Sequence, residues 1–147
     1  MFSIFALLCA VIPSLAQSLN DNADSIVGTY YAIQSGNESK VKVFKNADGT
    51  YTGQIFWVKN SIDPQGKKYC DIKNPDKALR TTPCDKIVLF KGLQYNAAKK
   101  QWDNAKIYDP TRGLKANVYV CFTPEGKLKI RGQIMGIGET VYWKKLD

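Results

Sequence analysis

The sequence predicts an all-β protein that forms a single up-and-down antiparallel β-barrel of about eight short strands. Three observations predict this fold class. Apolar and polar residues alternate with a period of two along most of the chain, which is typical of strands with one buried face. Turn-forming residues separate these runs at short intervals. No run shows the periodicity of a long amphipathic helix, and closing such a meander into a barrel removes its exposed strand edges.

The first part of the chain is expected to be a secretory signal peptide. Residues 1–16 carry no charged side chain and form an apolar run that Pro13 interrupts, followed by the small residues that a signal peptidase reads. We expect cleavage between Ala16 and Gln17 and an exported product, periplasmic or secreted. A lipoprotein anchored through Cys9 is the alternative. The apolar run is short for a bilayer span, and no second such run follows, so no membrane span is expected.

A polar, flexible lead at residues 17–25 is expected to precede a barrel domain at residues 26–147. The predicted strands lie at residues 27–33, 40–45, 50–58, 86–92, 101–108, 115–122, 127–134 and 139–146. The second strand alternates cleanly, and Asp48-Gly49 behind it is a strong hairpin signal because this pair tolerates positive φ. The third strand is expected to present Tyr51, Gly53, Ile55 and Trp57 on one face.

The later strands are bounded by short runs of Gly, Pro, Asn and Asp, at residues 96–100, 109–113 and 123–126. Eight strands enclose enough room for packed side chains or for one small ligand. A β-sandwich is the alternative architecture, but its crossovers need longer connections than most of those seen here.

One long polar segment, residues 59–85, interrupts the strand pattern. A segment of this length without regular structure is usually functional or disordered. Much of its polarity is explained by turn chemistry, as in Asn74-Pro75. The other interpretation is a lid over the barrel mouth, with Asp71, Asn74 and Arg80 directed at a ligand or fastening the lid.

Cysteine positions add a constraint on this segment. Cys70 and Cys84 bracket it, so we expect a disulfide between them in an oxidising compartment, contributing about 3 kcal/mol. Cys121 lies in a strand-like run and is expected to be a small buried apolar residue.

Composition excludes several function classes. The net charge of +8 comes mostly from lysines scattered along the chain, whereas nucleic-acid binding favours a clustered basic patch, so no nucleic-acid partner is expected. The chain has no histidine, which argues against zinc or copper, and it lacks a nucleophile elbow and a glycine-rich phosphate loop. We therefore expect neither an enzyme nor a bound cofactor.

Several short motifs occur together in one order. They are Gly28-Thr29-Tyr30, Tyr51-Thr52-Gly53-Gln54-Ile55-Phe56-Trp57, Asp71-Ile72-Lys73-Asn74-Pro75-Asp76 with Arg80, Trp102, Ile107-Tyr108-Asp109-Pro110, Ile130-Arg131-Gly132 and Trp143. As a set they resemble the exported bacterial family called domain of unknown function 2147. The resemblance implies a calycin-like barrel, related in shape to lipocalins, and it implies no activity. Calycins pair a tryptophan of the first strand with a late arginine; here Tyr30 replaces the tryptophan and Arg131 is the corresponding arginine.

The function that these observations favour is the binding of a small apolar or amphiphilic molecule in the barrel. Aromatic residues make up 12% of the chain, and barrel mouths lined by rings are common ligand sites. Arg80 and Arg131 suggest an anionic or polar end on the ligand. The alternative is an envelope or secreted protein that acts through its basic surface and has no internal ligand; the oligomeric state is left open. The candidate ligand-binding residues are Tyr30, Trp57, Asn74, Arg80, Trp102, Tyr108 and Arg131.

Overall fold

The computed structural model describes residues 19–147 of the chain. The predicted signal peptide and its cleavage site after Ala16 lie outside these residues, so export stays a prediction. Within the described part, no helix is both long and apolar enough to cross a membrane.

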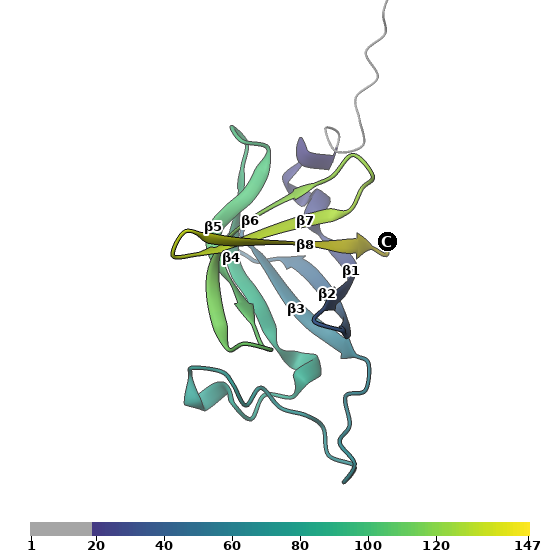
Figure 1. Ribbon diagram of the computed structural model, residues 1–147. Helices are drawn as coiled ribbons and strands as arrows, with labels where there is room; N and C mark the ends of the chain where they lie inside the picture. Colours follow the sequence, from purple (N-terminus) through teal and green to yellow (C-terminus); the bar gives the residue numbers. More distant parts are fainter. Residues whose placement is uncertain (1–18) are drawn as a thin grey trace, which may run out of the picture.

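Eight antiparallel strands close into one barrel in chain order (Figure 1), which confirms the predicted fold class. Each strand pairs with the next, and the last strand closes the barrel against the first through Tyr30–Lys145 and Tyr31–Lys144. The strands are β1 (Gly28–Gln34), β2 (Asn37–Lys45), β3 (Tyr51–Val58), β4 (Val88–Asn96), β5 (Gln101–Asp109), β6 (Leu114–Phe122), β7 (Leu128–Ile134) and β8 (Ile137–Lys145).

Two-residue turns of the mirror-image type join β1 to β2 and β7 to β8. Ser35 and Gly36 have φ values of 50° and 78°, and Met135 and Gly136 have values of 50° and 79°. Turns with positive φ at both positions match the twist of the strands that they connect. The turn between β7 and β8 lies at the rim of the barrel, where the tip of this hairpin is exposed.

A β-bulge in β3 changes which face its last residues present. Val41 pairs with Ile55 and Lys40 pairs with Trp57, so Phe56 is an extra residue on β3. Because side chains alternate along a strand, one inserted residue moves every later side chain to the opposite face. Trp57 was predicted to share a face with Ile55; instead Ile55 is buried inside and Trp57 lies on the outer surface.

A second irregularity lengthens β4 beyond its prediction. The strand was expected to end at Gly92, but it continues to Asn96. Gly92 has a φ of 72°, and the pairing with β3 shifts register between Phe90 and Leu93. Glycine marks a bulge here and not a strand end.

The end of the barrel near residue 19 is closed by the residues before β1. A short 3-10 helix, η1 (Ala23–Ile26), lies against this end, and Ile26 is fully buried. The Asn20 side chain donates to the Phe122 carbonyl (3.0 Å) and accepts from the Phe122 N–H (2.7 Å). Tyr95 Oη donates to the Asn20 carbonyl at 2.5 Å. The lead was predicted to be flexible, but residues 19–25 are held in place by these contacts.

The long segment between β3 and β4 lies at the opposite end of the barrel (Figure 1). It contains two short 3-10 helices, η2 (Lys77–Leu79) and η3 (Cys84–Lys86), and two isolated bridges, Ile62–Lys68 and Cys70–Pro83. We call residues 59–87 the end segment. Its position beside the mouth agrees with the predicted place of a lid, although its contacts show a fixed wall, as described below.

Candidate functional site

The half of the barrel nearest the end segment contains a cavity of about 320 Å³. Inward-facing aliphatic side chains form its wall, including Leu89, Ile107, Ala116, Ile130 and Val141, and the Trp143 ring also lines it. Trp143 packs on Tyr30 and Phe90 with ring centroids 6.2 Å and 6.4 Å away, and so separates the cavity from the filled half of the barrel.

The cavity opens to solvent at the tip of the β7–β8 hairpin. Met135 and Ile137 line its rim and are 96% and 79% exposed. Large apolar side chains exposed at the entrance of an apolar cavity extend the apolar surface that an entering molecule meets. The site therefore offers a continuous apolar path from solvent to the Trp143 ring.

A wider hollow of about 800 Å³ adjoins the cavity, and the two share Gln34, Leu89 and Trp143 in their walls. The end segment forms one side of this hollow through residues 69–73 and Cys84. Lys59 and Glu38, which also line it, form an ion pair of 2.8 Å.

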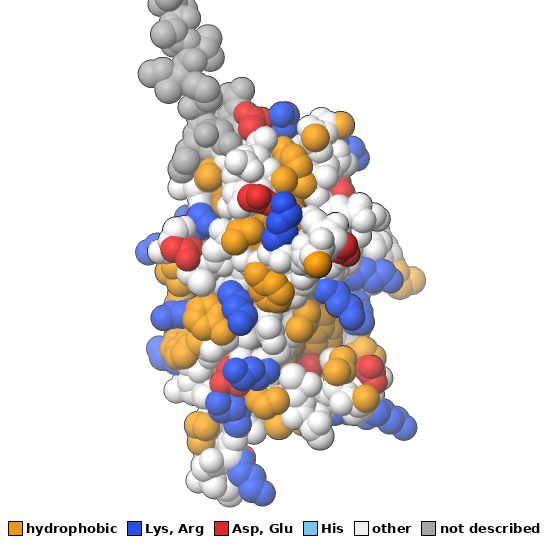
Figure 2. Space-filling model, turned by 180° about the vertical axis from the view of Figure 1, so that it is seen from behind, with side chains coloured by type: hydrophobic (Ala, Val, Ile, Leu, Met, Phe, Trp, Pro, Cys, Tyr) orange, Lys and Arg blue, Asp and Glu red, His pale blue; other side chains and the backbone are white. Residues whose placement is uncertain are grey.

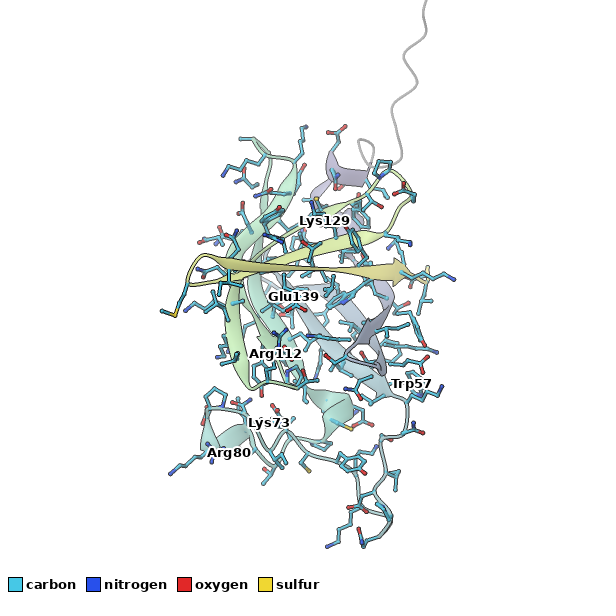
Figure 3. The ribbon with its side chains drawn as sticks, viewed as in Figure 1. Trp57, Lys73, Arg80, Arg112, Lys129 and Glu139 are labelled. Atoms are coloured by element: carbon cyan, nitrogen blue, oxygen red, sulfur yellow. The ribbon has the colours of Figure 1, made fainter. Side chains whose placement is uncertain are left out.

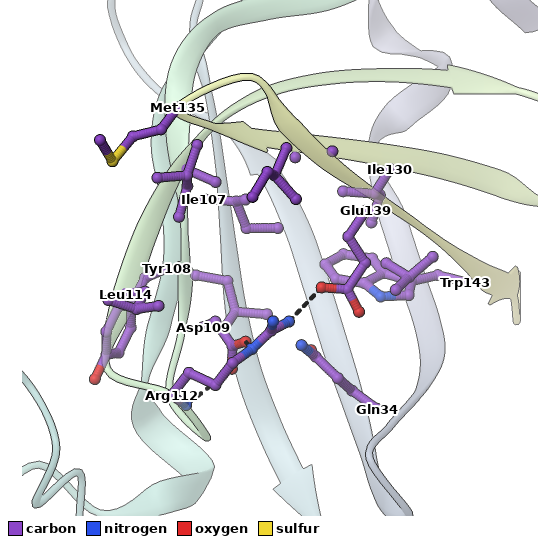
Figure 4. Close-up of a pocket in the computed structure, with 17 residues that line it drawn as sticks. Gln34, Ile107, Tyr108, Asp109, Arg112, Leu114, Ile130, Met135, Glu139 and Trp143 are labelled. Atoms are coloured by element: carbon purple, nitrogen blue, oxygen red, sulfur yellow. Dashed lines mark hydrogen bonds and ion pairs between the residues drawn. The ribbon is translucent and has the colours of Figure 1, made fainter.

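Three charged side chains stand at the rim of the cavity (Figure 4). Arg112 lies in the β5–β6 turn and donates through Nε to Asp109 Oδ2 at 2.6 Å. Its Nη2 reaches Glu139 Oε2 on β8, on the far side of the entrance. Gln34 of β1 points its side-chain amide toward Arg112 from below (Figure 4).

Asp109 holds this turn in place. Its Oδ1 accepts from the Thr111 N–H at 2.9 Å and from Thr111 Oγ1 at 2.6 Å. Burial raises the pKa of Asp109, but the hydrogen bonds from Thr111 and Arg112 outweigh burial, so the pKa lies below its ordinary value. The hydrogen bonds from Glu139 and Asp109 raise the pKa of Arg112. Asp109 and Arg112 are therefore both charged at neutral pH.

A buried network fastens the end segment to the barrel. Tyr108 Oη donates to Asp71 Oδ1 at 2.7 Å, and Asn74 Nδ2 donates to Asp71 Oδ2 at 2.8 Å. Arg80 Nε donates to the Asn74 carbonyl at 2.8 Å. Lys73 Nζ also donates to the Thr111 carbonyl at 2.8 Å. Burial and the hydrogen bond to Asp71 raise the pKa of Tyr108. The sequence left two roles open for Asp71, Asn74 and Arg80, namely contacting a ligand or fastening the segment. The contacts described here fasten the segment.

The structure places two of the seven candidate ligand-binding residues in the core of the filled half of the barrel, called the closed half below. Tyr30 is fully buried and donates its hydroxyl to the Ile26 carbonyl at 2.7 Å. Trp102 is fully buried as well, and its Nε1 donates to the Ala23 carbonyl at 2.9 Å. Neither lines the cavity. The sequence named both as candidate ligand-binding rings, but it could not tell which half of the barrel is filled.

Two more candidates lie on the outer surface. Trp57 stands at the lower end of β3 (Figure 3), with Lys40 Nζ 5.1 Å from its ring centroid. Arg131 alternates with the buried Leu128 and Ile130, faces outward, and donates to Thr140 Oγ1 at 3.0 Å. The predicted pairing of Arg131 with a ring of the first strand is therefore not present.

The remaining candidates belong to the end segment and its attachment. Arg80 lies in the segment, away from the barrel interior (Figure 3), and Asn74 is buried in the network described above. Tyr108 lines the cavity, so it is the one candidate that the structure brings to the cavity wall.

The two cysteines of the end segment are free thiols in the structure, so the predicted disulfide is absent. Cys70 pairs with Pro83, and neighbouring residues of an extended ladder point to opposite sides. Cys84, which follows Pro83, is accordingly directed elsewhere: its sulfur lies 4.0 Å from the Ser61 carbonyl, whereas that of Cys70 lies 3.6 Å from the Lys68 carbonyl. Cys121 was expected to be buried, but it is only partly buried, because it alternates along β6 with the inward-facing Val120 and Phe122. Its partial burial raises the pKa of the thiol.

Sequence reasoning missed Arg112, Glu139 and Gln34. Arg112 was seen only as part of a turn, and Glu139 as the start of a strand. The signal that could have found them is position, because all three lie at strand ends on the same side of an eight-strand meander, where the loops of one barrel end gather.

Within residues 19–147, no three His, Cys, Asp or Glu side chains come together in a way that could hold a metal ion. On the face shown in Figure 2, Lys and Arg side chains are scattered among apolar ones instead of forming one basic patch.

Comparison with known proteins agrees with this geometry. Residues 28–145 match the family described as "Uncharacterized protein conserved in bacteria (DUF2147)". The chain belongs to this family. No curated protein matches the chain.

Among solved structures, the chain is similar to one described as "Protein HP1028 from the human pathogen Helicobacter pylori belongs to the lipocalin family". The TM-score is 0.65 at 25% sequence identity, over 83% of each chain. Together with the closed barrel, this likeness gives the DUF2147 chain a lipocalin-like fold, as the motifs in the sequence implied.

Proposed function

We propose that this DUF2147 protein binds one small, mainly apolar molecule in the open half of its barrel. The observation that carries the proposal is the cavity itself, whose aliphatic wall continues to the exposed tip at Met135 and Ile137. Its volume of about 320 Å³ is within the range of small-molecule sites. Removing apolar surface from water contributes roughly 25 cal/mol per Å², so an apolar guest gains most from this wall.

The lipocalin-like fold is consistent with this proposal, and the attachment of the end segment supports it further. The hydrogen bonds Tyr108–Asp71 and Lys73–Thr111 hold the end segment in place as one wall of the hollow. A cavity formed in advance does not require the ligand to order the surrounding loops, which lowers the cost of binding.

Filling the cavity tests the proposal. Ala116 lines the cavity, and its β6 neighbour Asn117 is exposed on the outer face. We expect Ala116→Phe to weaken binding of the uncharged fluorescent probe N-phenylnaphthylamine by about tenfold or more, which corresponds to roughly 1.4 kcal/mol. Asn117→Phe, which adds the same ring outside, is the matched control and should leave the affinity unchanged.

Two further variants separate the cavity from the residues that the sequence suggested. Trp57→Ala and Arg80→Ala should leave probe affinity unchanged, because neither side chain lines the cavity. If the wild-type protein binds neither this probe nor Nile red, the proposal is wrong, and action through the outer basic surface becomes the better interpretation.

A further inference from the structure

The charged groups at the cavity rim are unequal in number. One guanidinium, that of Arg112, stands among two carboxylates, those of Asp109 and Glu139, although the chain as a whole has a net charge of +8. The adjoining hollow does not reverse this local excess, because its lysines, Lys59 and Lys73, are matched by Glu38 and Asp71.

Arg112 is already paired with two carboxylates. Its Nε donates to Asp109 and its Nη2 to Glu139, so a carboxylate that approached its remaining N–H donors would lie near two negative charges. Like charges held close together oppose such an approach. Arg80 and Arg131, which first suggested an anionic head group, do not line the cavity.

Hydrogen-bond acceptors, in contrast, are free at the rim. Among the described residues, Glu139 Oε1 has no hydrogen-bond partner, and neither does the side-chain amide of Gln34. Both groups line the cavity, and both lie on the side of Arg112 that is nearer to Trp143 (Figure 4). Glu139 is held in this position by its other oxygen, which accepts from Arg112.

From these contacts we infer that the ligand carries a hydrogen-bond donor without negative charge, a hydroxyl or an ammonium group, and that Glu139 and Gln34 accept it at the rim. The inference rests on the proposed function, because it describes the polar end of a molecule whose apolar part fills the cavity. The donor satisfies the free carboxylate oxygen, and a charged ammonium gains further from the excess negative charge.

Three probes with the same alkyl chain test this selectivity: decylamine, decanol and decanoate, each competing with N-phenylnaphthylamine at neutral pH and physiological salt. We expect decanol and decylamine to bind about tenfold more tightly than decanoate. The overall charge of +8 favours the opposite order, so the ranking reports the local groups and not the net charge of the protein.

Glu139→Gln removes the charge but keeps the size of the side chain. In this variant we expect decanoate affinity to rise and the gap between decylamine and decanoate to close. Glu125→Gln is the matched control: it changes the net charge equally, but it lies in the turn between β6 and β7, away from the cavity lining, and should preserve the gap.

Arg112→Gln provides a second, independent variant. Two carboxylates then lack their cation, so decylamine should bind more tightly and decanoate more weakly, with decanol little changed. The inference is overturned if decanoate binds the wild-type protein most tightly, or if Glu139→Gln leaves the gap intact. If none of the three probes displaces N-phenylnaphthylamine although that probe binds, the head-group inference fails and the cavity stands; if the fluorescent probe itself does not bind, the proposed function fails first.

Discussion

At the scale of single residues, Asp109 decides where the rim charges stand. It accepts hydrogen bonds from Thr111 and Arg112, and its main-chain carbonyl accepts from the Gly113 N–H at 2.8 Å. One carboxylate thereby shapes the β5–β6 turn and aims Arg112 across the entrance toward Glu139. The position of the charged groups at the rim thus depends on Asp109, whose own hydrogen bonds hold the β5–β6 turn.

The pH dependence of stability tests this role. Because the folded-state pKa of Asp109 lies below its ordinary value of about 3.9, its contribution is present above that value and is lost as the pH falls through the folded pKa. Asp109→Asn should therefore be less stable than wild type at pH 7, and the difference should shrink below about pH 4. Urea unfolding at a series of pH values measures this difference. Glu125→Gln serves as the control, and an Asp109→Asn deficit that persists at low pH would contradict the assignment.

At the scale of the elements, β3 passes very close to a ring of its neighbour. A Cβ added at Gly53 would lie 2.5 Å from two ring atoms of Phe90, so only glycine fits at this crossing. Gly132, on β7, is less crowded, since an added Cβ would meet Ala116 Cβ at 3.3 Å.

This difference predicts a graded effect of the same substitution. Gly53→Ala should destabilise the protein by about 1–3 kcal/mol, because the Phe90 ring must leave its position or the strand must shift. Gly132→Ala should cost clearly less. Urea denaturation of the two variants side by side measures the difference, and equal costs would show that Phe90 can yield freely.

The same strands show how far the sequence could be interpreted. Alternation and turn residues located all eight strands, because each strand has one face in the core and the period is local information. Trp57 was assigned to the wrong face and β4 was cut short at Gly92, because the bulges responsible depend on pairing with a distant strand. The candidate site was predicted least well. The sequence could suggest rings for the barrel interior, but only the fold shows that Tyr30 and Trp102 fill one half of the barrel. It also shows that Arg112 and Glu139 meet at the other half.

At the scale of the whole molecule, the barrel divides stability and binding between its two halves. The closed half contains the fully buried Trp102, whose ring also meets Phe122 edge-on at a centroid distance of 5.8 Å. The open half has the cavity and the fastened end segment. Substitutions in the two halves should therefore affect different measurements.

Trp102→Phe tests this division. The variant leaves the Ala23 carbonyl without its donor and removes part of a buried ring, which should cost about 2–4 kcal/mol of unfolding free energy. Its affinity for N-phenylnaphthylamine, measured where the variant is still folded, should equal that of wild type. A parallel loss of affinity would show that the two halves are coupled.

The seam between β1 and β8 bears on the order in which the barrel forms. Tyr30 pairs with Lys145, and the Thr29 N–H donates to Asp147 Oδ1 at 2.7 Å, so this seam joins the two ends of the barrel sequence. A chain emerging from its amino end can form each hairpin as it appears, but β1 has no partner on this side until β8 arrives. Closure is thus the most non-local pairing in the molecule and the slowest to nucleate. Until it forms, the edge of β1 remains open to other chains, and the incomplete barrel is the species most prone to aggregate.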